Sequence, residues 1–62
     1  MQQRLYACLA RVECANGEGE TFPLETYGWD VADAALSLAL LAEERAKELN
    51  GTVTDMTEPE LS

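Results

Sequence analysis

The most informative absence in this sequence of 62 residues is histidine, which does not occur at all. Without an imidazole, serine and cysteine lack the base that most often activates them as nucleophiles. Structural zinc sites draw on sets of cysteine and histidine, and only two cysteines are present. The sequence also lacks a calcium-loop pattern and a phosphate-binding glycine loop followed by lysine. We therefore expect no enzyme, no cofactor and no metal site.

Basic residues are scarce: four of them, against twelve acidic residues, leave a net charge of −8. So acidic a chain is a poor ligand for nucleic acid or an anionic membrane, because both need a basic surface. It is attracted instead to basic partners, unless the charge only keeps a small protein soluble. The acidic residues alternate with apolar segments, which is typical of a folded domain and not of an acidic tail.

Long apolar runs are absent as well. The leucine-rich stretch 34–42 is nine residues long, whereas a helix needs about 20 apolar residues to span a membrane. No secretory signal is recognisable. We expect a cytoplasmic protein.

Alternating apolar residues predict the first strand, over residues 3–14. The pair Asn16-Gly17 predicts a hairpin loop, because both residues tolerate positive φ angles. A second strand is expected over residues 20–27. It contains Pro23, which has no N–H to donate to a neighbour, so it should lie at the edge of the sheet.

The clearest signal predicts a helix over residues 31–49. Asp30 is a good N-cap and Asp33 is favourable in the first turn, while Asn50-Gly51 should end the helix. At 100° per residue, one helix face should cover the sheet. Its residues are Val31, Ala34, Ala35, Leu38, Leu41, Ala42 and Leu49.

These elements predict an α+β fold in which one helix packs on a three-stranded antiparallel sheet. The third strand is expected over residues 52–57, so a single ββαβ domain spans residues 1–57 and residues 58–62 form a flexible tail. A right-handed crossover would place the third strand beside the long first strand. The strand order is then 2-1-3, and the second face of the sheet stays open to solvent or to a partner.

The two cysteines, Cys8 and Cys14, belong to the same predicted strand. Six residues of strand separate them by about 20 Å, and a disulfide needs Cα atoms within about 7 Å. We expect two free thiols that serve as small apolar residues in a reducing compartment.

Two surfaces are candidates for binding a partner, and the first is acidic. Carboxylates three or four residues apart on a helix are about 5–6 Å apart. That distance is comparable to the spacing of charges along a nucleic-acid backbone, so such an array could occupy a basic groove that binds DNA. The alternative is that these are ordinary solvated positions. The candidate residues are Asp30, Asp33, Glu43, Glu44 and Glu48 of the helix, with Glu18, Glu20 and Glu25 of the hairpin.

The second candidate surface is apolar. Leu36 and Leu40 lie one turn apart on the side of the helix away from the sheet, and Trp29 precedes the helix. Tryptophan is a favoured interface anchor, and an exposed apolar patch usually marks an interaction site. The alternatives are that the helix is buried on more sides, or that Trp29 packs against the helix N-terminus.

In its size, acidity and lack of catalytic residues, the whole chain resembles the small phage-encoded inhibitors of host defence, in particular the anti-CRISPR proteins. The resemblance involves no shared motif and carries over no functional residue. It implies a phage protein in the host bacterial cytoplasm that acts as a DNA mimic. Such an inhibitor would occupy the basic DNA-binding surface of a CRISPR effector subunit and block DNA recognition.

A second hypothesis belongs to another class of protein. The chain would be a non-catalytic structural or regulatory module that homodimerises through the outer helix face or a sheet edge. The sequence leaves the oligomeric state open between a monomer and a weak homodimer, and the second hypothesis requires the homodimer.

Overall fold

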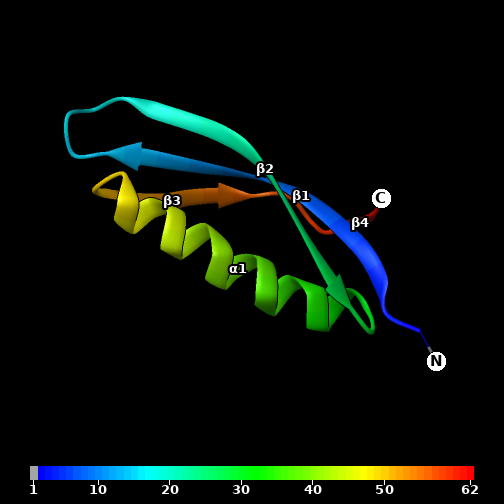
Figure 1. Ribbon diagram of the computed structural model, residues 1–62. Helices are drawn as coiled ribbons and strands as arrows, with labels where there is room; N and C mark the ends of the chain where they lie inside the picture. Colours follow the sequence, from blue (N-terminus) through cyan, green and yellow to red (C-terminus); the bar gives the residue numbers. More distant parts are fainter. Residues whose placement is uncertain (1) are drawn as a thin grey trace.

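The central element of the sheet is strand β1 (Arg4–Cys14). The computed structural model describes residues 2–62. Strand β1 pairs antiparallel with β2 (Gly19–Gly28) on one edge and with β3 (Gly51–Met56) on the other. Helix α1 (Val31–Glu48) lies along one face of this sheet (Figure 1). The α+β class, the ββαβ order and the strand order 2-1-3 are confirmed.

The β1–β2 hairpin turns through the four residues between its strands. The Gly17 N–H donates to the Cys14 carbonyl at 3.0 Å, and the Glu18 N–H donates to the Asn16 side-chain oxygen at 3.0 Å. Gly17 has a φ of 88°, which an L-residue with a Cβ rarely adopts. Pro23 belongs to β2 and lies opposite Leu9 of β1. Strand β2 is an edge strand, as predicted.

Small side chains dominate the core between β1 and α1. Its buried residues are Tyr6, Cys8, Ala10 and Val12 of β1, and Ala34, Leu38, Ala42 and Ala46 of α1. Half of them are alanine, so the helix lies close to the sheet. The approach is close at Gly28, where an added Cβ would lie 3.0 Å from the Ala34 backbone nitrogen. The first turn of α1 thus rests on the end of β2.

The buried face of α1 differs in part from the predicted one. The fully covered residues recur every four positions and include Ala46, which was not predicted, whereas Val31 and Leu41 are 50% and 37% exposed. A row with a spacing of four winds slowly around a helix, because four residues turn through 400°. The contact line therefore shifts across the predicted face along the helix. This contact line passes beside Val31 at the start of the helix and beside Leu41 further along, which leaves both side chains partly exposed.

The helix ends one residue earlier than predicted, and the next residues form the expected stop. The Leu49 N–H donates to the carbonyls of Arg45 and Ala46 at 3.2 Å. Asn50 then adopts a φ of 52°, the left-handed conformation that commonly follows a helix.

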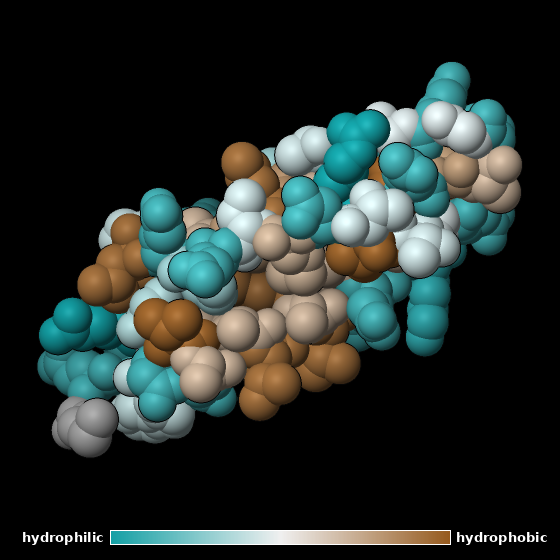
Figure 2. Space-filling view, turned by 180° about the vertical axis from the view of Figure 1, so that it is seen from behind, coloured by the Kyte–Doolittle hydropathy of each residue, from teal (hydrophilic) through white to brown (hydrophobic). Residues whose placement is uncertain are grey.

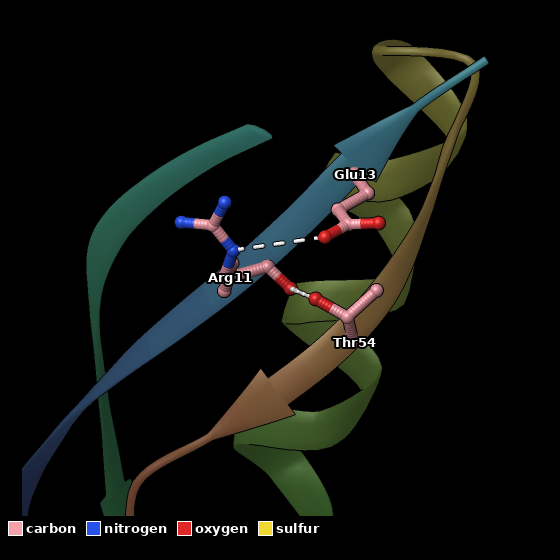
Figure 3. A network of polar contacts seen from close by, with 3 residues as sticks. All are labelled: Arg11, Glu13 and Thr54. Carbon is pink, nitrogen blue, oxygen red and sulfur yellow. Dashed lines mark hydrogen bonds and ion pairs between the residues drawn. The ribbon is translucent and has the colours of Figure 1, made fainter. Parts of the chain in front are cut away.

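Strand β3 contains a bulge that changes its pairing with β1. Arg11 lies opposite Asp55, but Val12 lies opposite Val53, so Thr54 is the extra residue. The Thr54 hydroxyl donates to the Arg11 carbonyl at 3.4 Å (Figure 3). Within β1, Arg11 Nε lies 3.9 Å from a Glu13 carboxylate oxygen. This half of the outer sheet face is therefore polar.

A fourth strand, β4 (Glu60–Leu61), pairs with Tyr6 and Ala7 of β1. Residues 58–62 are predicted above to form a flexible tail; the structure gives residues 60 and 61 a place in the sheet. The physical reason is the mismatch in strand length, since β3 pairs only with residues 10–14 of β1. The remaining edge of β1 needs partners for its N–H and C=O groups, and the end of the chain supplies them.

Replacing Gly51 by alanine should destabilise the fold by about 1–3 kcal/mol, the usual cost of overpacking. A Cβ at Gly51 would lie 2.7 Å from the Glu13 carbonyl oxygen and 2.6 Å from a Val12 methyl carbon. Gly19→Ala is the matched control, because its nearest neighbour is the mobile end of the Arg11 side chain. Urea unfolding followed by circular dichroism measures both; equal losses of stability would refute the close approach at Gly51.

Candidate protein interface

The start of α1 engages two of the predicted acidic residues in local hydrogen bonds. The Asp30 carboxylate accepts from the Asp33 N–H at 2.8 Å, and the Asp33 carboxylate accepts from the Trp29 N–H at 2.9 Å. Asp30 is the N-cap, as predicted. Both carboxylates therefore hold the first turn of the helix, whatever else they contact.

The outer surface of α1 exposes large apolar side chains. Leu36 is 71% exposed and Leu40 is 67% exposed, on the side of the helix away from the sheet. Trp29 is 52% exposed and borders an open hollow of about 410 Å³ that it lines with Gln2, Arg4 and Tyr6. Figure 2 shows apolar side chains gathered at the middle of one face of the molecule, with hydrophilic side chains towards both ends.

Glu44 and Glu48 continue the row of Leu36 and Leu40 along the outer side of α1, because the four residues follow one another at intervals of four, opposite the buried row. Arg45 marks the side of the helix that faces β2: its guanidinium carbon lies 5.7 Å from the centre of the Phe22 ring. Arg45 also lies 3.3 Å from a Glu48 carboxylate oxygen. Glu44 and Glu48 are one turn apart, which brings their side chains to neighbouring positions on the helix surface.

Glu43 lies on the other side of the helix. It lines a hollow of about 200 Å³ with Lys47 and Val53, next to β3. Glu43 and Glu44 are adjacent in sequence and both exposed, but Glu44 follows the row of the exposed leucines whereas Glu43 is turned towards β3.

The hairpin contributes acidic residues at the end of the molecule where α1 terminates. The Ala15 N–H donates to the Asn50 carbonyl at 3.3 Å, which ties the hairpin loop to the helix end. Glu18 in the loop and Glu20 in β2 are both exposed there. Glu25, by contrast, lies opposite Ala7 on the open face of the sheet. The predicted acidic residues thus do not form one continuous surface.

The surface as a whole remains strongly negative. Eleven of the twelve acidic residues are exposed and Asp33 is half-buried. Within residues 2–62, the ion pairs are Arg11–Glu13 and Arg45–Glu48. The remaining carboxylates are screened mainly by solvent, so their field extends to a partner in solution.

Comparisons with protein-family models, with curated proteins and with solved structures return no match for this chain. Across the described residues, no helix has the length and apolar character required to cross a bilayer. The same residues contain no grouping of three or more acidic or cysteine side chains that could hold a metal ion.

The two cysteines are free thiols on the same strand, as predicted. Cys8 is buried against the helix, and this burial raises the pKa of its thiol above the ordinary value. Cys14 is half-buried at the end of β1.

A thiol reagent should therefore modify Cys14 in the folded protein before Cys8. The thiolate is the reactive form, and Cys8 is both shielded from the reagent and more fully protonated at a given pH. Labelling kinetics of Cys8→Ser and Cys14→Ser at pH 8 measure each thiol alone, and urea-unfolded samples provide the reference rate. Equal rates in the folded proteins would contradict the burial of Cys8.

Proposed function

We propose that the protein is a small acidic inhibitor that binds the basic DNA-binding surface of another protein through the outer surface of α1. The observation that carries this proposal is the contrast between the two sides of the helix. Three alanines and Leu38 fill the side packed on the sheet, whereas Leu36 and Leu40 are exposed on the other side, bordered by Glu43 and Glu44. Large apolar side chains that are exposed to solvent in the isolated protein lower its solubility and are typical of an interface.

The acidic residues determine which kind of partner fits. A surface rich in lysine and arginine is attracted by the net charge of −8. Once the leucines exclude water from the contact, the neighbouring carboxylates act in a lower effective dielectric and interact more strongly with cations. In keeping with the resemblance to anti-CRISPR proteins, we propose a CRISPR effector subunit in the bacterial cytoplasm as the partner. Occupation of its DNA-binding groove would block DNA recognition.

Charge also argues against the alternative, a homodimer formed by the same helix surface. Two antiparallel copies of α1 that met at Leu36 and Leu40 would place Asp33 of one copy beside Glu43 of the other. Two parallel copies would place each glutamate beside itself. Like charges in close contact across an interface cost several kcal/mol, so the helix surface favours a basic partner.

Charge reversal on the outer surface of α1 tests the proposal. Glu44→Lys should weaken binding about tenfold or more, because it places a cation against a basic surface. Glu13→Lys is the matched control: it makes the same change of net charge at an exposed position on the open face of the sheet, away from α1. Each variant is used to capture partners from lysates of bacteria that carry CRISPR systems, at low and at high salt.

The expected result is a DNA-binding subunit that the unaltered protein and Glu13→Lys capture at low salt. High salt should release it, because 1 M salt shortens the screening length to about 3 Å, and DNA should compete with it. Equal capture by both variants would show that the outer surface of α1 is not the contact. Capture that survives high salt and excess DNA would refute DNA mimicry.

The exposed leucines supply a second, independent test. Leu36→Ser and Leu40→Ser should change the free energy of unfolding by no more than about 0.5 kcal/mol, because both side chains are already in water. The same changes should weaken capture of the partner. Sedimentation of the unaltered protein at high concentration should show a monomer. A dimer that Leu36→Ser dissociates would instead support the structural-module hypothesis.

A further inference from the structure

The open face of the sheet, opposite the helix, divides into an apolar half and a polar half. Along β1, Leu5, Ala7 and Leu9 face outwards first, followed by Arg11 and Glu13. Neighbouring β2 residues extend the apolar half, with Tyr27 opposite Leu5 and Pro23 opposite Leu9. Leu9 is 49% exposed and Tyr27 is 63% exposed. This apolar area is separate from the outer surface of α1, because the sheet lies between them.

The apolar half is hollowed. A depression of about 340 Å³ has Ala7, Leu9 and Pro23 on its floor. The chain after β3 forms its wall, and the wall residues that line the depression are Thr57, Glu58, Glu60 and Leu61.

Hydrogen bonds hold this wall against β1 at both ends. The Thr57 N–H donates to the Leu9 carbonyl at 2.9 Å, and the Thr57 hydroxyl accepts from the Leu9 N–H at 2.9 Å. At the other end, the Ser62 N–H donates to the Leu5 carbonyl at 3.0 Å. The depression is therefore built into the sheet and does not require a partner to form it.

Carboxylates surround the apolar floor. Glu25 of β2 and Glu60 of β4 lie on either side of Ala7, two strand spacings or roughly 10 Å apart. Glu58 stands on the wall, and all three side chains belong to exposed residues. No lysine or arginine of the described chain lines the depression, so nothing basic within it offsets these charges.

We infer that this depression binds a lysine or arginine side chain from an extended basic segment of a partner protein. Such a side chain combines a methylene stem, which the apolar floor of Leu9 and Pro23 would cover, with a cationic head that Glu58 and Glu60 would receive. A neutral apolar ligand would leave the acidic rim without a counter-charge. A second copy of the chain would bring the same carboxylates against one another.

This site goes beyond the proposed function and does not depend on it. The two binding surfaces lie on opposite sides of the protein, one on α1 and one on the open sheet. A single molecule could therefore hold two basic segments at the same time.

The test uses two blocked tripeptides of equal charge, trilysine and its analogue with 2,4-diaminobutyrate, whose side chain is two methylene groups shorter. Each is titrated into ¹⁵N-labelled protein and followed by amide chemical shifts. Trilysine should perturb the amides of Ala7, Leu9, Thr57 and Leu61. It should also bind roughly fivefold more tightly than the short analogue, because its longer stem removes more apolar surface from water.

Matched variants separate this site from general charge attraction. Glu60→Lys should weaken trilysine binding more than Glu13→Lys does, although both reverse a charge on the open face of the sheet. Glu60→Lys could displace β4, so Glu58→Lys repeats the test at a residue that lies outside any strand. Glu44→Lys should leave trilysine binding unchanged, which keeps a failure here distinct from a failure of the helix proposal.

Two outcomes would overturn the inference. Equal affinity for the two peptides, with shifts spread over acidic residues throughout the protein, would mean that charge alone attracts them. Shifts of the Leu9 and Leu61 amides that depend on protein concentration in the absence of peptide would show that a second copy occupies the depression.

Discussion

The close approach of α1 to the sheet governs much of this structure. Ala10 of β1 and Ala34 and Ala42 of α1 are fully buried, and Gly28 allows the first turn of α1 to touch the end of β2. A thin core of this kind leaves little room for large side chains, so most of the bulky apolar residues of α1 lie outside it. The same packing that permits so short a chain to fold also produces its exposed apolar surface.

Strand β1 imposes a second constraint, because it is longer than its partner β3. Backbone groups along the unpaired part of β1 must find hydrogen-bond partners, and Thr57 and β4 provide them. The chain passes Glu58 and Pro59 on its way to β4, and this segment lines the depression beside Leu9. A requirement of hydrogen bonding thereby creates the depression on the open face.

Local signals in the sequence were sufficient to predict most of the fold. The alternation along β1, the hairpin glycine, the N-cap at Asp30 and the stop at Asn50 each depend on neighbouring residues alone. The exact buried face of α1 could not be predicted in the same way, because it depends on the angle at which the helix crosses the sheet. Strand β4 was missed for a similar reason: Glu60 and Leu61 form a strand only because a distant edge is free.

The candidate surfaces were predictable to a different extent. Exposure of Leu36 and Leu40 followed from helical periodicity, but the side of the helix that faces β2 could be assigned only from the contact of Arg45 with Phe22. The depression at Leu9 had only a weak signal, the alternation of Leu5, Ala7 and Leu9 on the outer face of β1. Both surfaces place apolar residues among carboxylates, an arrangement that opposes self-association through like charge while leaving apolar area available to a cationic partner. In the proposed interactions, charge would therefore determine mainly which partners can contact the exposed leucines.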